Sequence, residues 1–317
     1  MEGLNNRLDC AIRRGLIYLE NLFESKAYAF SSMLYTKDRV EFTKDYDYKY
    51  SGIPDQFTYF FALDLLWSEF SPSVRSKLAD SLKPAAFDTL NYFFDPKIFA
   101  DEVDSTSLGY TSLLKAGIIT LDSIYPVAKK VFANVDENGV VEIHYKPAVK
   151  RRQNMLCAAI CCNVLRLAYT LREEDQVQKT EDYVYEWLRS GKWKTGTLYY
   201  PSGFTFLYYC STFAKINSRV KKRFAPMICI AVENSLTDCR FPLDYALALL
   251  VLENLGCKKY SKQIADKLLE MQNHDGSFPV DALWGDRYHV LWGGKALSTI
   301  CIVGALTAAI SNNESYE

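Results

Sequence analysis

PSGFTFLYYCSTFAKINSRVKKRFAPMICIAVENSL, residues 201–236, joins two helical patterns of opposite kind. Residues 201–214 are apolar on nearly every side, whereas residues 219–236 place apolar side chains along one helical face and charged side chains along the other. A helix that is apolar all round must be buried all round, and an amphipathic helix can cover it. This stretch therefore predicts an inner helix followed by an outer one.

The same pair of patterns recurs along the whole chain. Amphipathic segments occupy residues 6–23, 72–90, 123–133, 180–191, 219–236 and 261–272. Segments that are apolar nearly all round occupy residues 54–67, 105–121, 151–169, 201–214, 241–255 and 293–310. A repeat of roughly 40 to 50 residues per pair is typical of stacked helical hairpins.

These hairpins are expected to close into a ring rather than to form an open solenoid, because the inner segments are too apolar for an exposed concave face. We therefore predict an all-α fold, an (α/α)6 barrel of six helical hairpins that forms one domain over residues 1–317. Strand-like alternation is found almost only at residues 131–145, where the sequence Glu137-Asn138-Gly139 predicts a small β-hairpin inserted between helices.

Charge and cysteine usage narrow the function classes. The 37 basic and 38 acidic residues give a net charge of −1, which does not fit a dedicated nucleic-acid binder. The longest apolar run, residues 300–310, is too short to span a membrane, and the first residues lack the apolar core of a signal peptide. The nine cysteines lie mostly in apolar helical patterns, so we expect reduced, buried thiols and a cytoplasmic location.

Aromatic residues are abundant, at 14% of the chain with 22 tyrosines, and many stand just before the inner segments. In a closed barrel the N-terminal ends of all inner helices lie at one rim, so these residues should converge there with the acidic Asp104 and Asp244. The aromatic and histidine residues expected to bind an apolar substrate at this rim are Tyr199, Tyr200, Phe204, Phe241, Trp284, Tyr288, His289 and Trp292.

Two motifs resemble those of class II terpene cyclases, the squalene–hopene cyclase superfamily. EVDST, residues 102–106, resembles their Asp-x-Asp-Asp-Thr motif, and more closely the Asp-x-Asp-Thr-Thr variant of bacterial drimane-type cyclases. KLLEMQNHDGSF, residues 267–278, is similar to their Gln-Trp repeat. The resemblance implies an α/α barrel and a terpene cyclase of isomerase or lyase type that acts in terpenoid biosynthesis on a linear isoprenoid, expected to be a prenyl diphosphate.

The resemblance also implies roles for individual residues. Asp104 matches the Asp that protonates a terminal alkene or epoxide, with Glu102, Ser105 and Thr106 supporting this acid. Burial in a dry pocket would keep such an acid protonated. Aromatic faces would then stabilise the carbocation, by roughly 1 to 2 kcal/mol each when desolvated.

Cofactors and partners follow from the same resemblance. No metal is expected to be bound by the protein itself, and Mg²⁺ is expected only if the substrate carries a diphosphate. Members of the superfamily usually place the site between two barrels, so a chain of one barrel implies a homodimer, a second barrel partner or a lid.

Other interpretations of the same residues stay open. Asp104 or Ser105 could simply cap a helix, with Glu102 in solvent. Asp104 and Asp244 could form the acid and base of a glycosidase. The barrel could also bind an isoprenoid or a protein partner without catalysis.

A zinc-dependent prenyltransferase-like enzyme is a further alternative. The sequence Asp286-Arg-Tyr-His289 resembles the His segment of protein prenyltransferase β subunits, although Asp238 and Cys239 are adjacent where that family separates its Asp and Cys by one residue. No DDxxD-like magnesium motif and no Gly-rich phosphate loop is present in the sequence.

Overall fold

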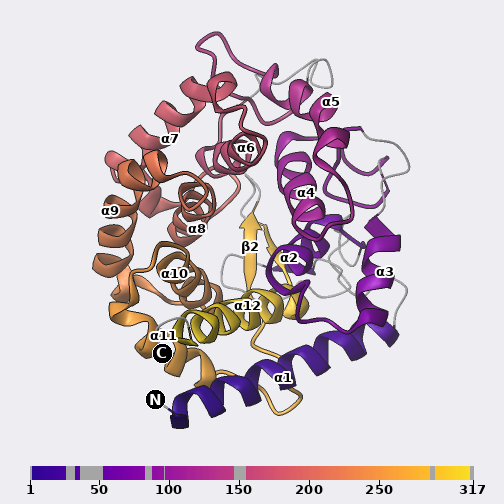
Figure 1. Cartoon of the computed structure of the whole chain (residues 1–317), viewed down its shortest axis with the longest axis vertical. Coiled ribbons are helices and arrows are strands. Elements are labelled where there is room, and N and C mark those ends of the chain that lie inside the picture. The colour runs from indigo at the N-terminus through magenta and orange to yellow at the C-terminus, as the bar shows by residue number, and fades with distance from the viewer. Residues whose placement is uncertain are drawn as a thin grey trace.

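Two concentric rings of α-helices make up the structure, a computed structural model that describes residues 2–25, 33–35, 53–82, 88–95, 97–145, 155–285 and 290–314 (Figure 1). The inner ring consists of α2 (Gln56–Leu66), α4 (Val103–Lys115), α6 (Ala158–Leu171), α8 (Gly203–Ala214), α10 (Pro242–Leu255) and α12 (Lys295–Glu314). The outer ring consists of α1 (Glu2–Ser25), α3 (Pro72–Leu82), α5 (Leu121–Phe132), α7 (Gln178–Arg189), α9 (Ser218–Ser235) and α11 (Ser261–Glu270). Short 3₁₀ helices lie at η1 (Glu174–Val177), η2 (Lys192–Thr195), η3 (Leu236–Asp238) and η4 (Lys258–Tyr260).

The hydrophobic pattern explains which helices lie inside. Every residue of α8 is buried, as the apolar pattern of residues 201–214 predicts. In α9 the buried residues recur every three or four positions and form one stripe that faces the inner ring. Val220, Phe224, Ile228, Val232 and Ser235 make up this stripe.

The inner helices pack in chain order, and the ring closes where α12 contacts α2. The outer helix α1 also packs against α12, so the first and last helices lie side by side (Figure 1). This closure confirms the predicted (α/α)6 barrel. Because successive inner helices run in the same direction, their N-terminal ends share one rim of the barrel.

β-structure is sparse in the described residues. The predicted hairpin near residues 131–145 is reduced to one antiparallel bridge between Val135 and Val141, because α5 continues to Phe132. Gly139 makes the turn between them with φ +80°, a conformation that glycine adopts without strain.

A small sheet, which the sequence did not predict, adds β1 (Met33–Tyr35), β2 (Ala282–Gly285) and β3 (Leu291–Gly293). Its strands are antiparallel in the order β1-β3-β2. In the view of Figure 1, β2 lies at the centre of the inner ring. Every residue of β2 and β3 is buried, and the Gly285 N–H at the end of β2 donates to the carbonyl of Tyr199, so the sheet packs against the segment that leads into α8.

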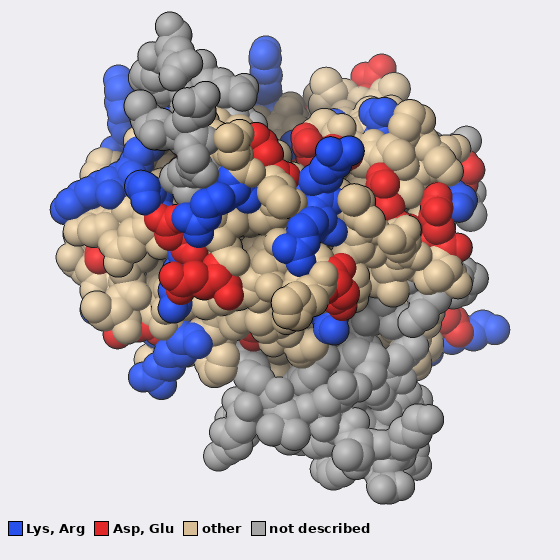
Figure 2. All heavy atoms as spheres, turned by 90° about the horizontal axis from the view of Figure 1, so that it is seen from below, with Lys and Arg blue, Asp and Glu red and all other residues tan. Residues whose placement is uncertain are grey.

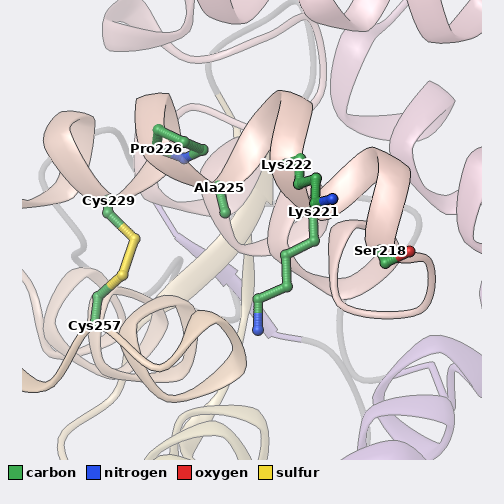
Figure 3. A pocket seen from close by; sticks show the side chains of 7 residues that line it. All are labelled: Ser218, Lys221, Lys222, Ala225, Pro226, Cys229 and Cys257. Atoms are coloured by element: carbon green, nitrogen blue, oxygen red, sulfur yellow. A yellow bond between two sulfur atoms is a disulfide. The ribbon is translucent and has the colours of Figure 1, made fainter.

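The expectation that all cysteines are reduced is wrong for one pair. Cys229 of α9 and Cys257, which follows α10, form a disulfide with an S–S distance of 2.00 Å (Figure 3). Packing of the outer α9 on α10 places the two residues together, with their Cα atoms 6.5 Å apart, although 28 positions separate them. The other described cysteines are free thiols, and all but Cys10 are buried.

The surface carries both signs of charge. On the face seen in Figure 2, basic and acidic side chains are interspersed. None of the described helices is long and apolar enough to cross a membrane.

Candidate active site

The first turn of α4 places its acidic residues in different roles. Glu102 is the N-cap, and its carboxylate accepts hydrogen bonds from the backbone N–H groups of Asp104 at 2.5 Å and Ser105 at 2.7 Å. Glu102 is only 6% exposed. The alternatives that Asp104 or Ser105 caps the helix and that Glu102 lies in solvent are therefore wrong, because the Glu102 carboxylate already satisfies these N–H groups.

The Asp104 carboxyl is consequently free to point away from its own helix end. The side-chain amide of Asn163, in α6, donates to Asp104 Oδ1 at 2.7 Å. The hydroxyl of Tyr200, just before α8, donates to Asp104 Oδ2, and the hydroxyl of Tyr209 in α8 donates to that of Tyr200 at 3.5 Å. Asp104 is thus buried and accepts hydrogen bonds from residues of two other helical hairpins.

Burial changes the protonation of this carboxyl. It raises the pKa of Asp104 to about 6, against the hydrogen bonds from Tyr200 and Asn163, which lower it. Burial and the neighbouring Asp104 charge also raise the pKa of Glu102, to about 8. The two carboxyls titrate as a pair that retains a proton near neutral pH. Asp104 therefore keeps its proton to a higher pH than an exposed aspartate, whose pKa is near 3.8.

Ser105 and Thr106 hold the segment rather than the Asp104 carboxyl. The Thr106 hydroxyl donates to the Glu102 carbonyl at 2.7 Å and accepts from the Leu90 backbone N–H at 2.9 Å. Ser105 is fully buried beneath the cap. The support of the acid by Ser105 and Thr106 stays a prediction.

A second buried aspartate, Asp64 in α2, has the opposite electrostatic environment. Arg166 of α6 binds both Asp64 oxygens, at 2.5 and 2.9 Å, and Lys115 lies 3.1 Å away. Burial alone would raise the pKa of Asp64, but these charges outweigh it and hold the pKa well below its usual range. Of these two buried aspartates, only Asp104 has a raised pKa and keeps its proton above the usual range of an aspartate.

Aromatic rings continue from Asp104 across the interior. Along this series the ring centroids are 5.3 Å apart for Tyr200 and Tyr209, 6.4 Å for Tyr209 and Phe61, 5.8 Å for Phe61 and Phe57, and 5.1 Å for Phe57 and Trp284. These five residues come from α2, α8, β2 and the segment before α8. We call them the aromatic circuit.

A backbone hydrogen bond links the two ends of the aromatic circuit. The N–H of Gly285, next to Trp284, donates to the carbonyl of Tyr199 at 2.9 Å, and Tyr199 precedes Tyr200 in the chain. The two ends of the aromatic circuit, Trp284 and Tyr200, therefore lie on neighbouring backbone segments, and Tyr200 binds Asp104. Tyr200 thus links the buried acid to this set of rings.

Other predicted substrate-binding residues lie around this circuit. Trp292 of β3 is 6.0 Å from the ring of Tyr92, which in turn is 5.2 Å from that of Trp284. Phe204 is buried in the first turn of α8, and Phe241 is the half-buried N-cap residue of α10. Tyr288 and His289 lie outside the described residues.

Several buried side-chain polar atoms have no hydrogen-bond partner in the part of the chain that the structure describes, and two of them belong to the asparagine that binds Asp104 and to the tryptophan of the aromatic circuit. These two atoms are Asn163 Oδ1 and the indole nitrogen of Trp284. Most buried polar atoms in proteins are paired, so such atoms mark positions where a ligand or water can bind.

The glycosidase alternative gains no support from the position of Asp244. The Ser202 hydroxyl donates to one of its carboxylate oxygens at 2.6 Å, and the backbone N–H groups of Arg240 and Phe241 donate to the other at 3.0 and 3.1 Å. Asp244 therefore stabilises the start of α10.

The zinc alternative receives no support from the described residues. They contain no group of three or more His, Cys, Asp and Glu side chains that could hold a metal ion. Asp238 is exposed whereas Cys239 is buried, and the segment from Asp286 to His289 lies outside the described ranges.

Comparisons with known proteins support the fold. No family model matches the sequence, and no curated protein matches it. Among solved structures, a variant of the type II terpene cyclase MstE from Scytonema, in complex with its substrate geranylgeranyl dihydroxybenzoate, is similar with a TM-score of 0.72. The two chains are 11% identical, and the match covers 98% of this chain and 99% of that one.

Two further structures show how widely this architecture is used. A protein from Actinoplanes has a TM-score of 0.68 at 15% identity, with 96% of this chain and 99% of that chain covered. An unsaturated glucuronyl hydrolase specific for heparin has a TM-score of 0.59 at 10% identity, with 98% of each chain covered. At such identities the likeness establishes the α/α barrel, and the argument for activity rests on the site.

Sequence reasoning missed Asn163, Phe57, Phe61 and Tyr209. Asn163 had a recognisable signal, because it is the one strongly polar residue in AAICCNVL, residues 158–165, a segment expected to be buried on every side. The aromatic residues within the inner helices had none, since core packing explains an aromatic residue in a buried helix equally well.

Proposed function

We propose that this protein is a class II, protonation-initiated terpene cyclase in which Asp104 is the general acid. The observation that carries the proposal is the separation of roles at the start of α4: Glu102 caps the helix, and Asp104 is left as a buried carboxyl with a raised pKa. A buried acid of this kind beside aromatic rings suits proton transfer to an apolar substrate.

In this mechanism a terminal carbon–carbon double bond of the isoprenoid takes the proton of Asp104. A C–H bond forms, the carboxyl O–H bond breaks, and the substrate becomes a tertiary carbocation. The remaining double bonds attack in turn and close the rings, and loss of a proton from the final cation gives a product isomeric with the substrate. Either a base or water receives this proton.

Asn163 and Tyr200 assist the first step. Both donate hydrogen bonds to Asp104, and these bonds strengthen when the carboxyl becomes an anion. An interaction that is stronger in the transition state than in the ground state lowers the barrier. The faces of the aromatic circuit can stabilise the positive charge as it moves along the chain.

The proposed substrate is a linear isoprenoid that lies against the aromatic circuit. A prenyl diphosphate with Mg²⁺ is one candidate, as the motif resemblance implies. The compound bound by MstE, a geranylgeranyl chain on dihydroxybenzoate, adds a second candidate that needs no diphosphate. A homodimer or a partner barrel is a separate proposal, which light scattering of the purified protein tests.

The test is incubation of purified protein with farnesyl diphosphate, geranylgeranyl diphosphate, geranylgeranyl dihydroxybenzoate and squalene, each with and without Mg²⁺. Products are extracted with and without phosphatase treatment and identified by mass spectrometry. We expect a cyclised isomer of one substrate, absent with Asp104→Asn and retained with Asp101→Asn, a carboxyl of the neighbouring segment.

Full turnover by Asp104→Asn would refute the assignment of the acid. No product from any substrate would refute the cyclase proposal for these isoprenoids and favour a barrel that binds without catalysis.

A further inference from the structure

Trp284 combines a buried ring with an unused hydrogen-bond donor. The residue lies in β2, is 8% exposed, and packs its ring against those of Phe57 and Tyr92 at 5.1 and 5.2 Å. Its indole N–H has no hydrogen-bond partner within the described residues. Leaving a buried N–H unpaired costs free energy, so a role for this donor is expected.

The neighbouring rings cannot fully replace an acceptor. An aromatic face accepts an N–H only weakly compared with an oxygen atom. The donor also belongs to the aromatic circuit, in which four ring contacts lead from Trp284 to Tyr200, the partner of Asp104. Because Gly285, next to Trp284, bonds to Tyr199, next to Tyr200, the two donors lie on neighbouring backbone segments, and a substrate folded back on itself would meet both.

We propose that the Trp284 N–H binds an oxygen atom on the head group of the isoprenoid whose terminal double bond lies at Asp104. This proposal rests on the proposed function and specifies its substrate class: isoprenoids with a hydrogen-bond acceptor at the head are selected over pure hydrocarbons. An alcohol, a diphosphate and an aryl acid share this chemistry.

Selection arises because a hydrocarbon in the same place would keep the Trp284 N–H buried and unpaired. A site built to bond a polar group rejects the analogue that lacks it more strongly than a hydrophobic pocket rejects a missing methylene. Trp284 is thus a specificity-determining residue, and Asp104 remains the group that reacts.

The test measures binding rather than turnover. In the Asp104→Asn background, isothermal titration calorimetry gives the dissociation constants of geranylgeraniol and of the hydrocarbon with the same carbon skeleton but no oxygen. We expect the alcohol to bind more tightly, and Trp284→Phe to weaken its binding by about tenfold while leaving that of the hydrocarbon unchanged. Geranylgeranyl diphosphate should lose more, since hydrogen bonds to charged groups are stronger.

Trp292→Phe is the matched control, because it deletes the same indole nitrogen from a neighbouring strand while keeping an aromatic ring. It should alter the affinities for the alcohol and the hydrocarbon equally. An equal loss for both ligands in Trp284→Phe would show that only ring packing matters and would overturn the proposal, as would an unchanged affinity for the alcohol. Circular dichroism melting curves verify that both variants fold.

The two proposals can fail separately. If wild-type protein forms no cyclic product but Trp284→Phe still loses the alcohol selectively, the cyclase proposal fails and the assignment of Trp284 as the head-group donor stands. If cyclisation occurs but Trp284→Phe weakens the binding of the alcohol and the hydrocarbon equally, the cyclase proposal stands and the assignment of Trp284 as the head-group donor fails.

Discussion

Replacing Asp104 by Asn should stabilise the protein at neutral pH while removing its proposed acid. In the folded protein burial raises the pKa of Asp104 from its ordinary value near 3.8 to about 6. A shift of roughly two pH units corresponds to about 3 kcal/mol, which the folded wild type loses when this group ionises. The amide of the variant cannot ionise, so it avoids this loss.

The hydrogen bonds around the position can be kept in the variant. An amide oxygen can still accept from Asn163, and the amide N–H can donate to the hydroxyl of Tyr200, which loses only its former acceptor. The gain at pH 7.5 should therefore lie between about 1 and 3 kcal/mol, because the buried Tyr200 O–H that loses its acceptor offsets part of the electrostatic value.

The gain should depend on pH in a defined direction. Between about pH 4 and 6 the folded wild type binds more protons than the unfolded chain, so its free energy of unfolding falls as the pH rises. The difference between variant and wild type is thus small at pH 4 and complete above about pH 6. Urea denaturation followed by tryptophan fluorescence at pH 4 and pH 7.5 measures both values.

Asp64→Asn is the control, for which a change in stability of opposite sign is expected. The pKa of Asp64 lies well below its usual range, so its ionised form stabilises the fold over this entire pH interval. Its removal leaves Arg166 buried without its partner and should cost about 3–5 kcal/mol. A loss of stability in Asp104→Asn at pH 7.5, comparable to that in Asp64→Asn, would refute the assignment of a raised pKa to Asp104.

Three further predictions test other features. Tyr200→Phe removes a hydrogen bond that lowers the pKa of Asp104. Turnover should fall roughly 10- to 100-fold, and the alkaline limb of the pH–rate profile should move to higher pH. An alkaline limb at the same pH as in the wild type would contradict this contact. Arg166→Met breaks the buried ion pair with Asp64 and should lower the free energy of unfolding by about 3–5 kcal/mol. Arg189→Met removes an exposed ion pair and should leave the stability unchanged. Equal effects of the two substitutions would argue against burial as the cause. Gly276→Ala, at φ +87°, would place its Cβ 2.4 Å from a backbone carbonyl of α1. It should destabilise the protein more than Gly256→Ala, at φ +78°, where the space around the glycine is open. Equal denaturation midpoints of the two variants would show that α1 adjusts at no cost.

The barrel could be predicted from the sequence because inner and outer helices differ in one-dimensional pattern. Residues 201–214 and 219–236 show this difference most clearly, and both helices form where expected. Asp104 could also be placed at the start of an inner helix, since caps and helix starts are local features. Which carboxyl caps the helix depends on the conformation around Glu102, and the pattern of residue types does not determine it.

Contacts between distant segments could not be predicted. Asn163 meets Asp104 across 59 positions and Tyr200 meets it across 96, so both contacts depend on how the inner helices are rotated. The disulfide between Cys229 and Cys257 was missed for a similar reason, because each cysteine alone fits an apolar helical pattern. The unpartnered N–H of Trp284 is likewise a property of the assembled interior.

Closure of the ring by α12 against α1 and α2 has a consequence for biosynthesis. The parts of α1 and α2 that α12 covers stay exposed until α12 has left the ribosome, about 310 residues after α1 begins. Contacts of such long sequence separation slow folding and expose hydrophobic surface in the meantime. We therefore expect the nascent chain to complete its core only once α12 has emerged, and truncation before α12 to yield a chain that chaperones retain.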